Sequence, residues 1–220
     1  MDQQSANKRS LKAYHRVLTL LPQKEIKLAN FGSGSVFDFE KILINYSRYI
    51  KVTAIDVFNE PIAIPHNLSY IQADLTKHLS IGNFDVITFF EFLEHVDETD
   101  IVLRNIKNNL NRNGILIFSI PNLASIYSRI ELLFGFQPHI LEVSNESSLF
   151  GTGIMGRLNS PTGEAIHHIR GITFRAMKEM LAFHGFELLD YWGFDHRIGN
   201  LPKIFTSLSP CCYFYCKLLD

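Results

Sequence analysis

Five short apolar runs alternate with segments that can form helices in the first 120 residues of the chain. The runs cover residues 26–31, 51–57, 68–71, 84–90 and 114–120. They mostly lack the polar alternation of a strand that has one face in water, and this is typical of strands buried on both faces. The alternation with helices predicts βαβ units, and therefore an α/β fold with a mostly parallel sheet.

A helix is expected near the N-terminus, and a long irregular segment is expected after the fifth strand. Leucines and a tyrosine recur at near-helical spacing over residues about 5–21. Residues about 122–134 also have a helical pattern, but residues about 135–166 are rich in Gly, Ser, Pro and Asn and show no clear period. A loop this long in a compact domain is usually functional or disordered. We therefore expect residues 135–166 to form a lid-like insertion.

Regular structure is predicted again after this insertion. Thr173 can cap a helix, and Gly185 stands where a glycine commonly ends one. Residues 186–194 and 211–218 are predicted strands, and an antiparallel edge strand on an otherwise parallel sheet is common. The length of 220 residues fits one domain over residues 1–220.

Composition and charge argue against several classes of protein. The net charge is -1 and the pI about 6.8, so nothing indicates a general binder of nucleic acid or of anionic membranes. No uninterrupted apolar run approaches the roughly 18 to 20 residues of a membrane span, and the polar N-terminus lacks a secretory-signal pattern. The three cysteines, Cys211, Cys212 and Cys216, do not form a disulfide framework, and we interpret them as strand residues. The sequence predicts a cytoplasmic protein in a reducing compartment.

A glycine-rich turn follows the first predicted strand, in Asn30-Phe31-Gly32-Ser33-Gly34-Ser35. Such a turn lets the backbone approach a ligand closely, and the next helix can receive an anionic or polar group at its N-terminus. A dinucleotide fingerprint needs a third glycine where Phe37 stands, so a nicotinamide-dependent oxidoreductase is a minor alternative. Taken alone, the turn is also compatible with a tight turn that binds nothing.

Acidic residues follow the next two strands. Asp56 comes about 20 residues after the glycines, where an acid can accept hydrogen bonds from both hydroxyls of a ribose. Asp74 follows the third strand and can accept a hydrogen bond from an exocyclic adenine amine. Each acid alone is equally compatible with a cap or a surface loop. Because ligands of open α/β sheets bind at the carboxyl ends of the strands, the three loops together predict one binding crevice.

These segments resemble the motifs of class I S-adenosylmethionine (SAM)-dependent methyltransferases. The first three motifs are matched by residues 28–34, 55–56 and 73–75, and later segments by residues 113–122 and 168–186. The most distinctive match is Phe84-Asp85-Val86-Ile87-Thr88-Phe89-Phe90-Glu91-Phe92-Leu93-Glu94-His95-Val96. It is similar to the fourth motif of the type 11/12 branch, which includes ubiquinone-biosynthesis O-methyltransferases. The resemblance spans about residues 27–194.

The resemblance implies a Rossmann-like, seven-stranded sheet with an antiparallel last strand, and SAM as the cofactor. It implies that the glycines approach the amino-acid part of SAM, that Asp56 holds the ribose and Asp74 the adenine, and that Phe90 lines the methionine side. The positions that it makes cofactor-binding are Asn30, Gly32, Ser33, Gly34, Asp56, Val57, Asp74, Leu75 and Phe90.

Two positions depart from the family pattern. The family usually has an acid at the position of Asn30 and another glycine near Val36. Asn30 carries no charge, so it would hold the ammonium group of SAM less well, and Val36 tightens the exit of the turn. These departures keep open the alternative of a decayed methyltransferase-fold module that binds or regulates without transferring a methyl group.

The candidate catalytic residues are Glu91, His95 and His168. Glu91, Glu94 and His95 form an E-x-x-E-H cluster just after the fourth strand, and on a helical turn they would fall on neighbouring faces. The intrinsic pKa of a histidine suits a general base. The alternative is structural, with these side chains capping a helix end.

A similar cluster binds a divalent metal in small-RNA 2′-O-methyltransferases and in some quinone-pathway relatives, where a later histidine completes the site. The resemblance makes Glu91, Glu94, His95 and His168 candidate ligands here. Such a set suits manganese, iron or zinc better than magnesium. A metal-dependent RNA methyltransferase is the less favoured reading, because no basic surface accompanies the cluster.

The leading prediction is O-methylation of a small molecule, a quinol precursor or a glycan, with no nucleic-acid partner. The insertion would lie over the acceptor, and its pocket-forming candidates are Phe134, Phe136, His139, Phe150, Met155 and Arg157. The sequence does not predict the oligomeric state.

Overall fold

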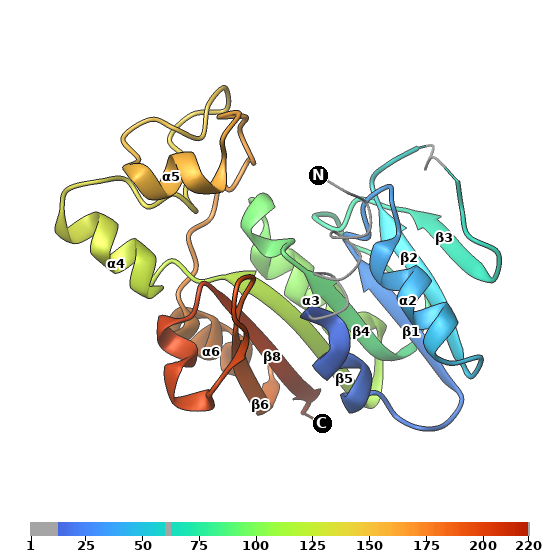
Figure 1. Ribbon diagram of the computed structural model, residues 1–220. Coiled ribbons are helices and arrows are strands. Elements are labelled where there is room, and N and C mark those ends of the chain that lie inside the picture. The colour runs from blue at the N-terminus through green and yellow to red at the C-terminus, as the bar shows by residue number, and fades with distance from the viewer. Residues whose placement is uncertain (1–12, 60–62, 220) are drawn as a thin grey trace.

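An eight-stranded sheet runs through the part of the chain that the computed structural model describes, residues 13–59 and 63–219. Its strand order is β3-β2-β1-β4-β5-β8-β6-β7 (Figure 1). The strands are β1 (Ile26–Phe31), β2 (Ile50–Asp56), β3 (Leu68–Gln72), β4 (Phe84–Phe90), β5 (Leu110–Pro121), β6 (Phe186–Asp195), β7 (Gly199–Leu201) and β8 (Cys211–Leu218).

The strand directions confirm the predicted α/β class. Strands β1 to β5 pair in parallel, whereas β8 is antiparallel to both β5 and β6. The predicted antiparallel last strand is therefore confirmed, but it lies between β5 and β6 and not at an edge. The predicted count of seven strands was one too few. The additional strand β7 forms an antiparallel edge beside β6, and its three residues are too short to show a periodic pattern.

Helices cover both faces of the sheet. They are a helix over residues 13–20, α2 (Asp38–Tyr46), α3 (Thr99–Asn109), α4 (Ile126–Leu133), α5 (Ile154–Asn159) and α6 (Phe174–Phe183), with short 3₁₀ helices η1 (Leu93–His95) and η2 (Lys203–Leu208). The N-terminal helix and α2 pack on one face, and α3 and α6 pack on the other. The helices and the sheet enclose two hydrophobic cores, one on each face of the sheet. Neighbouring strand residues alternate between them, with Val86 in one core and Ile87 in the other, as the two-residue period of a strand requires.

The predicted limits of α6 agree with the structure, whereas α4 begins at Ile126, four residues after the start of the segment predicted to be helical. The beginning of the helix expected over residues 5–21 lies outside the described residues. Thr173 caps α6, because its Oγ1 accepts a hydrogen bond from the Ala176 N–H at 3.2 Å. Gly185 follows the helix with a φ of 83°, a left-handed conformation that glycine adopts without steric cost.

Residues 122–170 form a lobe beyond the carboxyl end of β5, and α4 and α5 are its helices (Figure 1). Outside α5, the predicted insertion at residues 135–166 consists of turns, bends and irregular backbone. Backbone hydrogen bonds close the insertion on itself, as from the Ser148 N–H to the Gly163 carbonyl at 3.1 Å. Its role as a lid stays a prediction.

The cysteines and the helix lengths bear on two further expectations. Cys211, Cys212 and Cys216 are free thiols buried in β8, as their interpretation as strand residues requires. Within the described part of the chain, none of the helices combines the length and apolar character that a bilayer crossing needs.

Candidate functional site

The glycine turn after β1 leaves its outer side open. Gly32 and Gly34 have φ values of 67° and 66°, which favour glycine. The Gly32 N–H donates to the Ile55 carbonyl at 2.9 Å, so the turn is held against the end of β2. A Cβ on Gly32 would collide with the Phe92 ring, but a Cβ on Gly34 would meet no atom within 4 Å. The turn therefore leaves room for a ligand beside Gly34.

Asp56 connects this turn to the end of β2. Its Oδ2 accepts a hydrogen bond from the Gly34 N–H at 2.7 Å, and its Oδ1 accepts one from the Val57 N–H at 2.7 Å. A carboxylate has about four acceptor sites, so both oxygens keep lone pairs for a ligand hydroxyl. The Val57 side chain is exposed. These contacts place Asp56 beside the open side of the glycine turn.

Asp74 lies in the loop next to Asp56, where the Ala73 N–H donates to the Asp56 carbonyl at 2.9 Å. Its Oδ1 accepts from the Thr76 N–H at 3.0 Å and from the Thr76 hydroxyl at 2.6 Å, and these bonds lower the pKa of Asp74. Asp74 thus closes a local turn while remaining at the crevice. The Leu75 side chain is 2% exposed and packs in the core, so only its backbone is available to a ligand.

Asn30 takes part in a buried network that includes a glutamate absent from the sequence-based predictions. The Asn30 amide donates to Glu40 Oε1 at 2.7 Å, and its Oδ1 accepts from the Thr88 hydroxyl at 2.8 Å. Burial raises the pKa of Glu40 to about 7. Glu40 lies in the first turn of α2, and its burial leaves no trace in the sequence pattern. The sequence offered one signal for Glu40: it is an acid that comes shortly after β1, in a chain whose β1 has Asn30 where the family usually has an acid.

Aromatic rings pack around Phe90 at the end of β4. The Phe90 ring centroid lies 4.7 Å from that of Phe39 and 4.9 Å from that of Tyr14, which the N-terminal helix contributes. Tyr213 of β8 lies further away, at 6.1 Å. This aromatic cluster therefore combines residues from two helices and two strands far apart in sequence. At the exit of the turn, Val36 is exposed, and the left-handed residue is Phe37 with a φ of 57°.

The second centre lies just after β4, where Glu94, His95 and His168 meet. Glu94 Oε1 is 3.8 Å from His95 Nε2 and 3.8 Å from His168 Nε2. One ligand atom from each residue lies within 4.8 Å of the others. Glu94 is 1% exposed, and both of its carboxylate oxygens are buried without a hydrogen-bond partner. Burial and the neighbouring Glu91 raise the pKa of Glu94.

Backbone carbonyls orient both imidazoles of this cluster. His95 Nδ1 lies 3.1 Å from the His167 carbonyl, and His168 Nδ1 lies 2.8 Å from the Ile140 carbonyl. A carbonyl can only accept, so Nδ1 carries a proton on each ring, and in the neutral form of each ring Nε2 keeps the lone pair. Burial and the proximity of His168 lower the pKa of His95, which favours its neutral form.

A backbone clamp brings His168 to the turn after β4. The Ile169 and Arg170 N–H groups both donate to the Glu94 carbonyl, at 2.9 and 3.0 Å. The Arg170 guanidinium also donates to the Asp97 carbonyl. This clamp joins the segment that follows the insertion to η1, so the structure brings together three of the four residues predicted as metal ligands.

Glu91, the fourth predicted metal ligand, is not part of this cluster. The prediction assumed one helical turn through Glu91, but η1 begins only at Leu93, and Glu91 has a left-handed φ of 48°. Its Oε1 instead accepts hydrogen bonds from the Ser119 hydroxyl at 2.6 Å and from the Cys211 thiol at 3.1 Å. Glu91 therefore faces the ends of β5 and β8.

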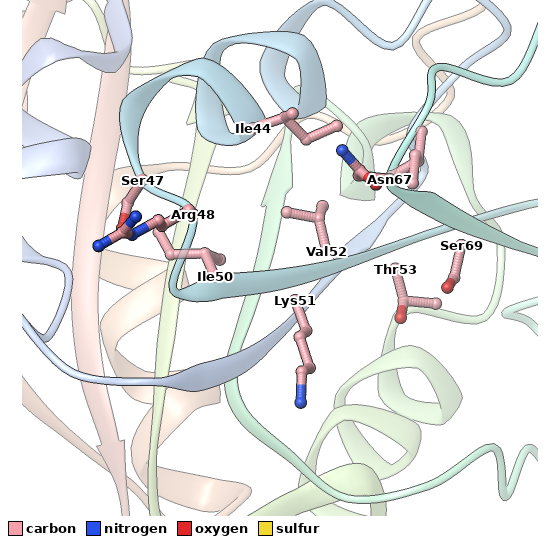
Figure 2. A pocket seen from close by; sticks show the side chains of 10 residues that line it. Ile44, Ser47, Arg48, Ile50, Lys51, Val52, Thr53, Asn67 and Ser69 are labelled. Atoms are coloured by element: carbon pink, nitrogen blue, oxygen red, sulfur yellow. The ribbon is translucent and has the colours of Figure 1, made fainter.

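Two cavities differ in their relation to this crevice. A cavity of about 570 Å³ lies at the amino ends of β2 and β3 (Figure 2). The glycine turn follows the carboxyl end of β1, which is parallel to β2, so the cavity lies at the opposite edge of the sheet. Ligands of parallel sheets bind at the carboxyl ends, so we do not assign this cavity to the site. A smaller cavity of about 60 Å³ lies between the insertion and the ends of β6 and β8, and residues such as His139, Met155 and Asp195 line it.

Comparisons with known proteins agree with this architecture. A family model described as a methyltransferase domain matches residues 5–191. No curated protein matches the chain. A putative methyltransferase solved with the Haloferax volcanii Trm112 methyltransferase activator has a TM-score of 0.64 at 10% identity, covering 100% of this chain and 95% of that chain.

Two further solved structures have the same fold. A SAM-dependent methyltransferase from Mesorhizobium loti has a TM-score of 0.60 at 14% identity, covering 93% of this chain and 97% of that one. A SAM-dependent methyltransferase from Thermotoga maritima, described as a possible histamine N-methyltransferase, has a TM-score of 0.62 at 15% identity, covering 97% of this chain and 89% of that one.

The Rossmann-like sheet with its antiparallel β8 and the glycine turn at the carboxyl edge define a class I methyltransferase fold, whose class uses SAM as methyl donor. The chain belongs to the methyltransferase domain family, because that family model matches most of its length. These matches show the class, and they do not single out the ubiquinone-biosynthesis branch within it.

Proposed function

We propose that the chain methylates an oxygen of a small molecule, a quinol precursor or a glycan, with SAM bound beside the glycine turn. The observation that carries this proposal is the pairing of two sites at one edge of the sheet. The open turn at Gly34 is tied to Asp56, and the Glu94–His95–His168 cluster lies just after the adjacent strand β4. Bound SAM supplies an electrophilic methyl group, and the protein supplies alignment and a base.

The chain's own residues would divide the binding of SAM as follows. Gly32, Ser33 and Gly34 present backbone to its amino-acid part, and Asn30 lies behind them. Asp56 accepts the ribose hydroxyls, and the exposed Val57 lies beside it. Asp74 and the Leu75 backbone receive the adenine, and Phe90 lines the methionine side. The fit is supported by the open space at Gly34 and by the free lone pairs of Asp56.

His95 is the base that we propose for the acceptor hydroxyl. Its Nδ1 proton is held by the His167 carbonyl, so the lone pair on Nε2 can take the acceptor's proton as the oxygen gains the methyl group. His168 is fixed in the same way and faces the same carboxylate. Glu91 would contribute its negative charge from the ends of β5 and β8. The insertion at residues 135–166 would cover the acceptor, since its Ile140 carbonyl orients His168.

The same cluster fits a divalent cation, and this is our second proposal for it. Two neutral imidazoles held at Nδ1 and a buried carboxylate with unpartnered oxygens form a ligand set with oriented rings. Ligand atoms about 2.0 to 2.1 Å from a tetrahedral zinc lie about 3.4 Å apart. Here Glu94 Oε1 lies 3.8 Å from each imidazole Nε2, and one ligand atom from each residue lies within 4.8 Å of the others, so the ligand atoms would have to move closer around an ion. A cation there would be held by Glu94, His95 and His168 and would lower the pKa of an acceptor hydroxyl, in place of the base role of His95.

The experiment that tests the donor site is calorimetric titration of SAM into the wild type and Asp56→Ala. We expect binding to the wild type and binding at least about 10-fold weaker to the variant, because loss of a hydrogen bond to a charged group costs about 1.5 kcal/mol or more. Glu25→Ala is the matched control, because Glu25 is exposed at the other end of β1 and pairs with Lys51. A wild type that does not bind SAM would overturn the proposal.

The acceptor is tested separately with a labelled methyl donor and panels of phenols, saccharides and amines. Transfer to hydroxyl compounds is expected. Transfer confined to amines would contradict the O-methylation proposal. SAM binding without transfer to any acceptor would favour the alternative of a decayed module.

A further inference from the structure

Glu40 is enclosed by protein on all sides, and one of its carboxylate oxygens has no partner. The side chain is 0% exposed. Oε1 accepts the hydrogen bond from the Asn30 amide at 2.7 Å, whereas Oε2 is buried without any hydrogen bond. The Thr88 hydroxyl donates to the Asn30 carbonyl oxygen and so fixes which end of the amide faces Glu40. The amide is therefore aimed at this carboxylate.

None of the charges that shift the pKa of Glu40 most strongly is positive. The charged groups that act on it are Asp38 of the same helix and Asp56 of β2, and both are acidic. Tyr14 of the N-terminal helix faces it as a neutral phenol, with a pKa raised by its own burial and by Glu40. A buried carboxylate without a cation is costly to ionise. The site is therefore short of one cation whenever Glu40 is charged.

Glu40 is joined to the part of the crevice that would receive a cation. Asn30 is the last but one residue of β1 and stands two residues before Gly32. In the family that the sequence resembles, the position of Asn30 carries the acid, and here the Asn30 amide donates a hydrogen bond to the carboxylate of Glu40. A cationic ligand group bound at the glycine turn would supply the positive charge that Glu40 lacks. Glu40 would in turn supply the negative charge that Asn30 lacks.

We propose that Glu40 is the counter-charge for the ammonium group of SAM, in the role that an acid at the end of β1 otherwise fills. This inference rests on the proposed function, because it needs SAM in the crevice. Asn30 stays neutral and passes its amide hydrogen bond to Glu40, so the negative charge resides on α2 instead of β1. The protein has thus moved the charge and not lost it, and Asn30 is no evidence of decay.

Calorimetric titration with two ligands tests this assignment. SAM carries the ammonium group, and 5′-methylthioadenosine keeps the adenosine and thioether but lacks the amino-acid part. Glu40→Gln should weaken SAM binding roughly 10-fold or more, because it removes a negative charge that attracts the ammonium group through the poorly solvated protein interior. Binding of 5′-methylthioadenosine should change less than about 2-fold. Glu187→Gln removes an exposed acid from β6, which does not contribute to the glycine turn, and should leave both affinities unchanged.

A second variant keeps the test independent of folding defects. Asn30→Asp combined with Glu40→Gln returns the acid to β1 and should restore SAM binding to within a few-fold of the wild type. Titrations of the wild type in buffers of different ionisation enthalpy at pH 7 should show release of about half a proton per SAM, because the ammonium group lowers a pKa that lies near 7. The Glu40→Gln variant should show no such release.

The outcomes separate this inference from the function on which it rests. If the wild type binds neither ligand, the proposed function fails. If the wild type binds both and Glu40→Gln either keeps full SAM affinity or loses both ligands equally, the proposed function stands and the role of Glu40 is wrong. A double variant that binds SAM no better than Glu40→Gln also overturns the role of Glu40.

Discussion

The stability of the ligand-free protein is expected to depend on pH through Glu40, and Glu40→Gln should remove that dependence. Burial raises the pKa of Glu40 from its ordinary value of 4.5 to about 7. The folded protein therefore holds this proton more tightly than the unfolded chain does. The resulting stabilisation is complete below pH 4.5 and is lost as the pH rises through about 7.

The distance between the two pKa values fixes the size of the effect. At roughly 1.4 kcal/mol per pH unit, the full loss is about 3 kcal/mol, of which about 2.5 kcal/mol falls between pH 5 and pH 8. Glutamine has nearly the same shape, and its carbonyl can accept the hydrogen bond from Asn30, but it does not titrate. The unfolding free energy of the wild type minus that of Glu40→Gln should therefore fall by about 2.5 kcal/mol over this range.

Urea unfolding at a series of pH values measures this difference. Trp192 is the chain's one tryptophan and is fully buried in the sheet, so its fluorescence reports unfolding. Taking the difference between two proteins that share every other titrating group removes the background, and Glu187→Gln gives the baseline for loss of an exposed acid on β6. A difference that stays constant or rises between pH 5 and pH 8 would refute the argument that burial keeps Glu40 protonated.

Two further outcomes are expected. Protein incubated with Zn²⁺ or Mn²⁺ and then desalted should retain about one ion per chain, because Glu94 and two oriented imidazoles form one ligand set. Elemental analysis should find less metal in His168→Ala than in the wild type. Equal metal contents would show that His168 is not a ligand. An alanine in the left-handed conformation costs roughly 1 to 2 kcal/mol. Gly32→Ala should lower the unfolding free energy by more than this, because its methyl group collides with Phe92, whereas Gly135→Ala has open space around it and should cost only that amount. Equal losses of unfolding free energy in urea would show that the Phe92 contact contributes nothing.

The strands and the first turn were predictable because their signals are local. A buried parallel strand is a continuous apolar run, and β1 and β4 begin and end at the predicted residues. The Thr173 cap and the Gly185 stop depend on residues within one helical turn, and both are present. The position of β8 inside the sheet was not predictable in this way, because strand order depends on pairing between residues far apart in the chain.

The positions of Glu91 and Glu40 at the site were not predictable either, because they depend on the folded structure and not on a local sequence pattern. Glu91 was placed with Glu94 by assuming helical spacing, but a left-handed residue comes before η1 and turns its side chain toward Ser119. Glu40 was overlooked because a glutamate in the first turn of a helix is usually exposed, and only the packed structure shows it enclosed. Both depend on a backbone conformation or a burial that no sequence period encodes.

His168 shows how the proposed catalytic cluster depends on the lobe. His168 lies far from β4 in the sequence, and only the resemblance to the methyltransferase family predicted that it joins the cluster. The physical cause is the clamp on the Glu94 carbonyl, together with the two imidazole–carbonyl contacts that join His95 and His168 to the segment and the insertion. Each such hydrogen bond contributes about 1 kcal/mol, so the four together hold the segment firmly. Because the same bonds orient both Nε2 atoms, undocking the segment would remove His168 and release His95 in one step, so the cluster exists only while the segment stays docked.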